Sequence, residues 1–522
     1  MWCSSLWPSL GESFNQRSGD LSMILGERLT VREMGAVERN SSYLGVPTGL
    51  LMENAGRSVA EEVKKRFNPG SRVTVVSGLS GNGGDGCVAA RHLAAAGYVV
   101  QVVVLGDPAH IAHENTRANY EALTRMSSSV NLTVVRDSSL VPEIEADVVI
   151  DGLIGTSMRG ALKPPFMQMV DSVNRADAYR VAVDVPTGME SDTGAVHGDC
   201  VHADLTVTFH RPKAGYTGNP RHLGELVVAS IGIPPEAEQF VGPGDVWAVH
   251  PARDPDAHKG MHGSLLVVGG SETYSGAPAL SAMGAYGVGL DLVYVAVPES
   301  AAQAVMGFSP SLITVKLRGD HLTEENVSQL EPFLGKVNAV AVGPGMGQRE
   351  DTVEAYTRLH GLAQDKGLPM VIDADGLKAH AEAKPKVRTP TVFTPHSKEF
   401  KILTGKDVGG EFRERGAVVQ REAKRLGAVV LLKGRVDVVS DGARTRYNWT
   451  GNPGMTVGGT GDVLTGVAGA YMAMGAAAFD AACAAAFVNG AAGDRVAAEK
   501  GYHLLPEDVA AEVPYAIEEC LK

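Results

Sequence analysis

Residues 452–462, Asn-Pro-Gly-Met-Thr-Val-Gly-Gly-Thr-Gly-Asp, contain four glycines between positions 454 and 461 and end on an acidic residue, Asp462. An apolar run that includes Val463, Leu464 and Val467 follows, so the stretch predicts a tight loop that opens a helix. The backbone N–H groups of such a loop point at one place, and a helix N-terminus adds roughly half a positive charge there. The stretch therefore predicts a binding site for an anionic phosphate.

Asp462 stands at the mouth of this predicted site, where its carboxylate would repel an anion. One interpretation is that Asp462 accepts a proton from a substrate hydroxyl while the loop stabilises a phosphoryl group in transfer. The alternative is that Asp462 only caps the helix, because Asp is a preferred N-cap residue. The catalytic interpretation is favoured, because a helix cap does not require four glycines.

Length and composition exclude several classes of protein. A chain of 522 residues is too long for one ordinary domain, and 44% hydrophobic with 20% charged residues is typical of a globular enzyme. The net charge of −13 argues against a nucleic-acid partner, which needs a basic face. The five cysteines are scattered without C-x-x-C spacing, which favours a reducing cytoplasm and no metal–thiolate site. They are Cys3, Cys87, Cys200, Cys483 and Cys520.

Segment 468–492 is alanine-rich, but Asp480 and Asn489 interrupt it, so it predicts a pair of buried helices instead of a membrane span. Residues 1–27 are expected to be an irregular N-terminal extension, and their start lacks the basic and apolar regions of a signal peptide. We expect a cytoplasmic protein that forms a homo-oligomer, with no membrane or nucleic-acid partner.

Two series of short β-branched runs, separated by helix-length segments, predict two α/β domains with parallel sheets covered by helices. The first series is 72–77, 99–105, 132–135, 148–150, 180–185, 205–209 and 226–230, and the second is 265–268, 292–297, 339–342, 370–372, 391–393 and 429–432. The Pro- and Gly-rich stretch 232–256 separates them. We expect a Rossmann-like three-layer αβα domain over 28–240 and a second α/β domain over 241–522.

In the first domain, polar clusters follow three predicted strands. The run Gly-Asn-Gly-Gly-Asp-Gly at 81–86 lies between a strand and a helix predicted over 87–96, which is the context of a dinucleotide or phosphate site. Because the carboxyl ends of parallel strands converge, the cluster side chains are expected to meet. They are Asn82, Asp151, Asp184 and Thr187. Such oxygen ligands suit a hard cation such as K⁺ or Mg²⁺. The alternative is that these residues only satisfy local turns.

Residues 28–235 resemble the NAD(P)H-hydrate epimerase family. The motifs that carry the resemblance are Leu-Met-Glu-Asn-Ala-Gly at 51–56, the glycine run 81–86, Asp151 with Gly-Thr-Ser-Met-Arg-Gly at 155–160, Asp-Val-Pro-Thr-Gly at 184–188 and Pro-Lys-Ala-Gly at 212–215. The resemblance implies K⁺ held by Asn82, Asp151 and Thr187. We take Asp184 as the catalytic carboxylate, with Lys213 tuning its charge. The implied substrate contacts are Gly81, Asn82, Gly83, Gly84, Asp85, Gly155, Thr156, Ser157, Met158, Arg159, Gly160, Ala161 and Asp184.

The second domain carries further polar and glycine-rich segments after its predicted strands. They are 269–278, 343–347, 394–399 and 433–437, in addition to the loop 452–462. His250, His258 and His262 lie in a Pro- and Asp-rich connector without the spacing of a helical zinc site, so we expect loop histidines there.

Residues 250–520 resemble the ADP-dependent NAD(P)H-hydrate dehydratase family, a branch of the ribokinase-like fold. The resemblance implies that Asp462 acts on the substrate hydroxyl, with ADP as co-substrate. We expect Glu399 to organise Mg²⁺ and phosphate from an outer shell. The implied substrate contacts are Ala277, Gly345, His396, Ser397, Lys398, Glu399 and Asp462. The implied ADP contacts are Lys433, Gly434, Arg435, Val436, Asp437, Asn452, Pro453, Gly454, Met455, Thr456, Val457, Gly458, Gly459, Thr460 and Gly461.

Two resemblances in one chain imply two activities. The first domain would epimerise the R and S forms of hydrated nicotinamide cofactor, NAD(P)HX, and the second would dehydrate the S form to NAD(P)H with ADP, giving AMP and phosphate. The alternative is a small-molecule kinase of the ribokinase type with a non-catalytic nucleotide-binding N-terminal module. The joint presence of Asn82, Asp151 and Asp184 argues against that alternative, because a binding surface needs no pair of strand-end carboxylates.

Overall fold

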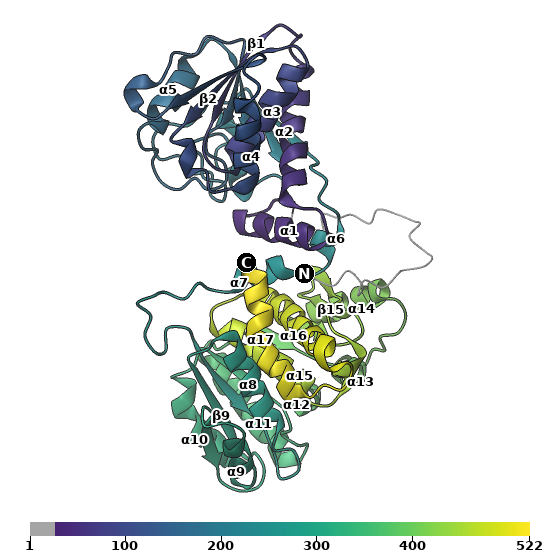
Figure 1. Ribbon diagram of the computed structural model, residues 1–522. Coiled ribbons are helices and arrows are strands. Elements are labelled where there is room, and N and C mark those ends of the chain that lie inside the picture. The colour runs from purple at the N-terminus through teal and green to yellow at the C-terminus, as the bar shows by residue number, and fades with distance from the viewer. Residues whose placement is uncertain (1–26) are drawn as a thin grey trace.

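A computed structural model of the chain describes residues 27–522 and has two lobes, each built on one sheet (Figure 1). Residues 1–26 lie outside the described residues, and with them almost all of the predicted N-terminal extension. The sequence pattern predicted two α/β domains, and the two lobes confirm that class.

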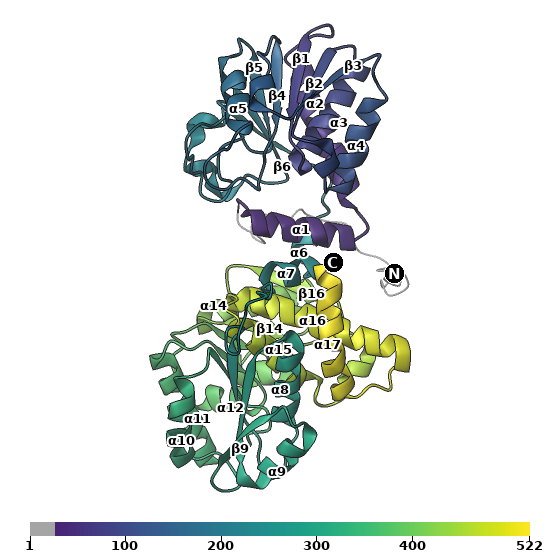
Figure 2. The ribbon, with the colours of Figure 1, turned by 60° about the vertical axis from the view of Figure 1, so that its left-hand side comes forward.

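The first lobe contains a seven-stranded parallel sheet in the order β3-β2-β1-β4-β5-β6-β7. Its strands are β1 (Arg72–Ser77), β2 (Val99–Leu105), β3 (Val130–Val135), β4 (Val148–Gly152), β5 (Tyr179–Val183), β6 (Leu205–Phe209) and β7 (Glu225–Ala229). Its helices are α2 (Thr48–Lys64), α3 (Gly81–Ala95), α4 (Glu114–Thr124) and α5 (Phe166–Arg175). In Figure 2, α5 lies on the opposite side of the sheet from α2, α3 and α4, which makes the predicted three layers.

The second lobe contains a nine-stranded sheet in the order β10-β9-β8-β11-β12-β13-β14-β15-β16. Its strands are β8 (Ser264–Val268), β9 (Leu292–Pro298), β10 (Ile313–Leu317), β11 (Ala339–Val342), β12 (Met370–Ile372), β13 (Thr391–Phe393), β14 (Val429–Leu432), β15 (Asp437–Ser440) and β16 (Thr445–Asn448). Its helices are α8 (Ala277–Val288), α9 (Glu299–Phe308), α10 (Glu324–Leu334), α11 (Glu350–Asp365), α12 (Asp375–Ala383), α13 (Ser397–Thr404), α14 (Phe412–Leu426), α15 (Thr460–Ala473), α16 (Ala478–Lys500) and α17 (Pro506–Leu521). Apolar clusters fill both faces of the sheet.

The prediction of a purely parallel second sheet was incomplete. β15 and β16 pair antiparallel to their neighbours at one edge, and β10 was not predicted. The hairpin between β15 and β16 turns at Asp441-Gly442, an Asp-Gly pair that favours such turns. The Asp-Gly pair is therefore a signal in the sequence for this hairpin.

The alanine-rich segment forms α15 and α16, whose side chains are largely buried in the second lobe, so the predicted pair of buried helices is confirmed. In the part of the chain that the structure describes, no helix is both long enough and apolar enough to cross a membrane.

The Pro- and Gly-rich stretch between the sheets is more ordered than a simple linker, because it contains α6 (Glu236–Gln239) and α7 (Pro243–Val249). Both lie near α1 (Val31–Tyr43), which crosses the space between the lobes (Figures 1 and 2). Buried Asp245 of α7 accepts hydrogen bonds from Arg446 of β16 at 2.5 Å and from Asn40 of α1 at 3.0 Å. A boundary near residue 240 therefore stays a prediction, and α1 contacts both sides of it.

Candidate functional site

The glycine run 81–86 differs from its predicted form. It is the first part of α3 itself, which begins at Gly81, whereas the sequence pattern predicted a loop followed by a helix over 87–96. The glycines serve close packing: a Cβ on Gly83 would lie 2.0 Å from the Gly78 carbonyl oxygen, and one on Gly84 would lie 2.7 Å from the Met52 sulfur. The run therefore places the N-terminus of α3, with its free N–H groups, at the carboxyl end of β1.

A buried oxygen cluster joins the ends of β4 and β5. The fully buried Asp151 carboxylate accepts hydrogen bonds from the Thr187 N–H at 2.8 Å, the Thr187 hydroxyl at 2.7 Å and the Leu153 N–H at 3.2 Å. Burial raises the pKa of Asp151 to about 6, although these hydrogen bonds lower it. Asn82 lies nearby: its Oδ1 is 2.8 Å from the place of a Cβ on Gly155, and its buried Nδ2 has no hydrogen-bond partner among residues 27–522.

Asp184 follows β5 with a φ of 60°, a left-handed conformation that is strained for a residue other than glycine. Its Oδ1 accepts hydrogen bonds from the Lys213 ammonium at 2.6 Å, the Thr208 hydroxyl at 2.9 Å and the Phe209 N–H at 3.1 Å. Lys213 is fully buried and forms an ion pair with Asp184, and its predicted role in tuning the charge of Asp184 stays a prediction. All of these contacts use Oδ1, which leaves Oδ2 as the oxygen available to a substrate.

The loop after β4 carries the other residues predicted to contact substrate in this lobe. The Gly160 N–H donates to Glu190 Oε1 at 3.0 Å, which fixes the turn, and Met158 is buried beneath it. Of the residues predicted to contact substrate in this loop, Ser157, Arg159 and Ala161 are exposed. Asp85 lies on α3, and burial, together with the charges of Asp184 and Glu38, raises its pKa well above the usual range.

In the second lobe the loop 452–462 opens α15, as predicted. The N-cap is Gly459, with a φ of 108°, and no side chain caps this helix. The alternative in which Asp462 serves as the N-cap is therefore wrong. Burial raises the pKa of Asp462 to about 7, with the negative charges of Asp373 and Glu399 adding to the effect and Lys433 opposing it. A carboxyl group with such a pKa exchanges protons near neutral pH.

Lys433 follows β14 and faces the mouth of the glycine loop. Its ammonium lies 3.3 Å from the place that a Cβ on Gly461 would occupy, and it forms an ion pair of 2.9 Å with Asp373 Oδ1. The Thr465 hydroxyl of α15 donates to Asp373 Oδ2 at 2.7 Å. Burial lowers the pKa of Lys433, but the carboxylates of Asp373, Glu399 and Asp462 together outweigh it, so the net pKa is raised and the ammonium stays charged. Lys433 and the N-terminus of α15 thus present positive charge together.

The residues predicted to contact the nicotinamide nucleotide lie on neighbouring loops. Gly345, with a φ of 63°, contacts the start of α8: a Cβ there would lie 3.4 Å from the Ala277 Cβ. The loop of Gly345 is held by Asp375, which accepts a hydrogen bond from the Gly347 N–H at 2.9 Å. Asp375 also raises the pKa of Asp462. These contacts place the Gly345 loop beside the Asp462 cluster.

His396 caps α13. Its Nδ1 accepts hydrogen bonds from the N–H groups of Lys398 at 3.1 Å and Glu399 at 3.3 Å, while Glu399 Oε2 accepts one from the His396 N–H at 2.9 Å. In the neutral ring the proton is therefore on Nε2, which is a donor on a half-exposed side chain. His396 and Glu399 therefore contact each other at the start of α13, with Ser397 and Lys398 between them in the sequence.

Hydrogen bonds to neighbouring residues fix the backbone of both segments that are predicted to hold ADP. In the turn after β14, the Gly434 N–H donates to Asp437 Oδ1 at 2.9 Å, and burial raises the pKa of Asp437 to about 6. In the glycine loop, Asn452 donates to Asp494 of α16 at 3.0 Å and accepts from the Gly454 N–H at 3.0 Å. The other predicted contacts on these segments are Arg435, Val436, Pro453, Met455, Thr456, Val457, Gly458 and Thr460.

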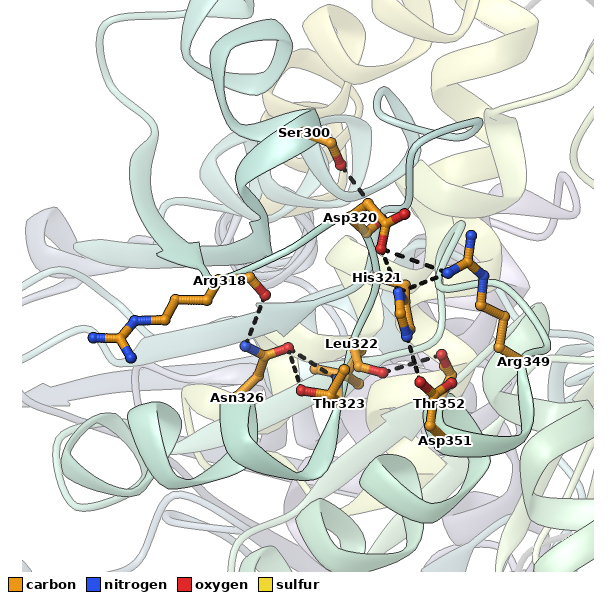
Figure 3. Close-up of polar contacts among 10 residues, drawn as sticks. All are labelled: Ser300, Arg318, Asp320, His321, Leu322, Thr323, Asn326, Arg349, Asp351 and Thr352. Carbon is orange, nitrogen blue, oxygen red and sulfur yellow. Dashed lines mark hydrogen bonds and ion pairs between the residues drawn. The ribbon is translucent and has the colours of Figure 1, made fainter.

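A polar network that was not predicted joins the loop after β10 to the start of α11, at the carboxyl ends of the parallel strands (Figure 3). His321 lies between Asp320 and Asp351, with both ring nitrogens 2.5 Å from a carboxylate oxygen, and Arg349 approaches from the side. Burial lowers the pKa of His321, but the two carboxylates outweigh it and raise the net pKa. The network fixes the start of α11, which directly follows the Gly345 loop.

Within residues 27–522, no group of three or more His, Cys, Asp or Glu side chains is arranged to hold a metal ion. Sequence reasoning missed Asp373 and Thr465, which organise Lys433. The signal for Asp373 was the run Asp-Ala-Asp-Gly at 373–376, directly after β12. It also missed Glu38, whose charge acts on Lys213 and Asp184 from α1.

Two family models match the chain, one in each lobe. The model described as YjeF-related protein N-terminus matches residues 48–215, and that of NAD(P)H-hydrate dehydratase matches residues 265–515. A solved structure similar to the second lobe is an ADP/ATP-dependent NAD(P)H-hydrate dehydratase from Bacillus subtilis, co-crystallised with ATP and Mg²⁺. It is 26% identical, covers 54% of this chain and 98% of its own, and has a TM-score of 0.48.

Full-length relatives combine both lobes in the same order. The bifunctional NAD(P)H-hydrate repair enzyme Nnr of Hyperthermus butylicus is 46% identical over 499 residues, 94% of this chain and 93% of that protein. The enzyme of the same name from Pyrobaculum aerophilum is 45% identical over 501 residues, 94% of this chain and 98% of that protein. The chain therefore belongs to the family of bifunctional NAD(P)H-hydrate repair enzymes.

Proposed function

We propose that the two lobes divide the repair of hydrated nicotinamide cofactor between them. The cluster at the carboxyl edge of the first sheet epimerises NAD(P)HX, and the cluster around Asp462 dehydrates one epimer with ADP. The observation that carries the second assignment is the place of Asp462: it lies in the first turn of α15 beside Lys433, and Gly459, not Asp462, is the N-cap. A carboxylate at an anion site is costly unless it accepts a proton.

Epimerisation requires little more than proton transfer at a fixed oxygen. The hydrate carries its hydroxyl on the ring carbon beside the nicotinamide nitrogen, so the nitrogen lone pair can expel the hydroxyl as water, and water can return to either face. Asp184 Oδ2 is the proton acceptor and donor in this proposal. Lys213 holds the other carboxylate oxygen at 2.6 Å and keeps the group in its strained, fixed orientation.

The oxygen cluster of the first lobe fits a monovalent cation. Asn82, Asp151 and Thr187 offer only oxygen ligands, and buried Asp151 has no basic side chain within ion-pair distance among residues 27–522. The Asp151 carboxylate is then the one negative charge of the site that has to be balanced. A single charge suits K⁺ better than a divalent ion. When bound, K⁺ would neutralise Asp151 and hold the ends of β4 and β5 together beside Asp184.

We expect epimerisation to depend on K⁺. Replacing K⁺ with tetramethylammonium at constant ionic strength should slow epimerisation of a single epimer, because the larger ion does not fit between these oxygens. The measurement is the rate of R-to-S conversion followed by chromatography. The same replacement should lower the thermal unfolding midpoint of the native protein. It should leave the midpoint of the Asn82→Ala variant unchanged. Equal epimerisation rates in both salts would assign these residues to the turns instead.

Dehydration has to remove a poor leaving group. In the proposed reaction, Asp462 takes the proton of the substrate hydroxyl. At the same time the hydroxyl oxygen attacks the terminal phosphorus of ADP, and AMP leaves. The C–O bond then breaks with phosphate as the leaving group, and loss of a proton from the neighbouring ring carbon gives NAD(P)H. Lys433 and the N–H groups at the start of α15 stabilise the phosphoryl group in transfer.

The carboxylates near Asp462 also fit a divalent cation. Glu399 is buried and acts electrostatically on Asp462, and carboxylate oxygens are ligands that Mg²⁺ accepts together with phosphate oxygens and water. When bound, Mg²⁺ would neutralise charge on the phosphates. Glu399 would hold it through water, because Oε2 already accepts a hydrogen bond from the His396 N–H.

The pKa of Asp462 predicts how dehydration depends on pH. Burial raises this pKa to about 7, and the group must be deprotonated to accept a proton, so kcat/KM for dehydration should rise with pH through about 7 and level off above it. The measurement is recovery of nicotinamide absorbance from the S epimer with ADP between pH 5.5 and 9. A profile that falls with rising pH over this range would contradict the role of a general base.

The full-length protein tests both assignments in one assay. With NAD(P)HX and ADP it should yield reduced cofactor, AMP and phosphate. If the second lobe were a plain kinase, a stable phosphorylated product would accumulate and no reduced cofactor would appear. Self-association into a homo-oligomer also belongs to the proposal, and sedimentation of the purified protein measures it.

A further inference from the structure

Helix α1 carries an acidic residue, Glu38, toward the Asp184 cluster of the first lobe. The start of the helix is fixed there, because Leu29 pairs with the segment of Lys213: the Leu29 N–H donates to the Pro212 carbonyl at 3.0 Å, and the Ala214 N–H donates to the Leu29 carbonyl at 2.9 Å. Met34 and Val37 of α1 are buried in the apolar core of the same lobe. Glu38 lies one turn from Met34 and directly after Val37, so it shares this inward face.

The other face of α1 is held by the second lobe. The Arg39 guanidinium lies 4.7 Å from the centre of the Trp247 ring, and Asn40 accepts a hydrogen bond from the Gly244 N–H at 2.8 Å. Tyr43 packs edge-on against Phe487 of α16, with ring centres 5.7 Å apart. α1 therefore packs against both lobes. These contacts fix the backbone from which Glu38 extends toward the Asp184 cluster.

The surroundings of Glu38 do not explain it as a structural residue. Its side chain is only partly exposed, yet its carboxylate forms no hydrogen bond or ion pair with any of residues 27–522. Burial raises its pKa to about 7; the charge of Lys213 opposes this, Asp184 adds to it, and Arg39 on its own helix opposes it weakly. The charge of Glu38 also acts on Asp85 of α3, where it helps to raise the pKa. A carboxyl group kept without partners beside a catalytic cluster is destabilising unless it has a function.

We propose that Glu38 is a second acid–base residue of the epimerase site, working with Asp184 on the hydroxyl of the hydrate. The inference rests on the epimerase function proposed for the first lobe. Epimerisation expels water from one face of the ring carbon and adds it to the other. One group must therefore give a proton while another accepts one, and Asp184 alone would have to serve both faces.

With two carboxyl groups, the protons and electrons of the epimerisation reaction balance. Protonated Glu38 gives its proton to the hydroxyl oxygen, the C–O bond breaks, water leaves and the nitrogen lone pair forms a C=N bond. Water then attacks the same carbon from the other face, the electron pair returns to nitrogen, and Asp184 Oδ2 accepts the surplus proton. The proton passes back to Glu38 through solvent. The reverse conversion exchanges the two roles, and no oxidant or reductant is needed.

Glu38→Gln in the full-length chain tests this proposal. It keeps the size and polarity of the side chain, so we expect kcat for epimerisation to fall about a hundredfold, the low end for loss of a general acid, with KM nearly unchanged. In the native protein the rate should fall as pH rises above about 7, because Glu38 loses its proton, and the variant should lack this limb. Dehydration of the S epimer should be unchanged.

Glu33→Gln is the matched control, with the same change on the same helix. Gln can keep the capping box that Glu33 forms with Thr30, so the fold and both activities should remain as in the native protein. Glu38→Asp, which retains an acid, should restore the limb above pH 7 and serves if Glu38→Gln unfolds. Epimerisation by Glu38→Gln within about threefold of native, or loss of rate with the pH limb retained, would overturn the proposal. If the native protein shows no epimerisation, the proposed function itself fails.

Discussion

Asp462→Asn should lower the rate of ADP-dependent dehydration by about a hundred- to ten-thousand-fold, the usual contribution of a general base. Asn keeps the shape of the side chain but cannot accept the hydroxyl proton. The measurement is recovery of reduced cofactor from the S epimer at saturating ADP. Asp462 lies at the start of α15 in the second lobe, whereas the Asp184 cluster belongs to the separate sheet of the first lobe, so epimerisation by the same preparation should be unchanged.

Asp508→Asn provides the matched control for Asp462→Asn. Both residues are acidic and occupy the same position in the first turn of a helix, three residues after the N-cap, in α15 and α17 respectively. Each substitution removes one favourable charge from a helix N-terminus, which is worth about 0.3–1 kcal/mol. Only Asp462 lies beside Lys433, so only its substitution should stop dehydration. Near-native dehydration by folded Asp462→Asn would contradict its role as base.

The sequence allowed both sites to be located because their chemistry lies where parallel strands end. Asp184 stood out because it follows a predicted strand and Asp462 because it follows a glycine-rich loop; in the structure Asp184 pairs with Lys213 and Asp462 lies beside Lys433. Asp373, which pairs with Lys433, also directly follows a strand, so the same rule applies to it, although no glycine-rich loop marks its position. A polar residue in the turn directly after a strand can therefore be predicted as a site residue from the sequence.

Other features depended on packing between distant segments. The run 81–86 was predicted to be a loop, but its glycines allow α3 to pack against α2 and β1, and that requirement comes from Met52 and Gly78. Glu38 was not predicted to be a site residue. Its place is set by pairing between Leu29 and Lys213, which are far apart in the chain, so no local pattern indicated it.

Asp184→Asn should abolish epimerisation and leave dehydration intact. A mixture of Asp184→Asn and Asp462→Asn should therefore carry out both reactions. Asn adopts the left-handed conformation of position 184 at low cost, so the backbone should hold. With ADP and a mixture of R and S hydrates, this variant should consume the S form quickly and then slow to the spontaneous rate of epimerisation. The measurement is the time course of reduced cofactor, which should show two phases instead of one.

Adding Asp462→Asn to the stalled reaction decides whether the two lobes act as separate catalysts on a shared substrate. That variant has no dehydratase base but keeps Asp184, so it should convert the remaining R form to S and let Asp184→Asn finish the reaction. Restored consumption requires the hydrate to leave one protein and enter the other. A single fast phase with Asp184→Asn alone would mean that the first lobe is not needed as an epimerase, and failure of the mixture would mean that the hydrate must pass directly between the two lobes of one chain.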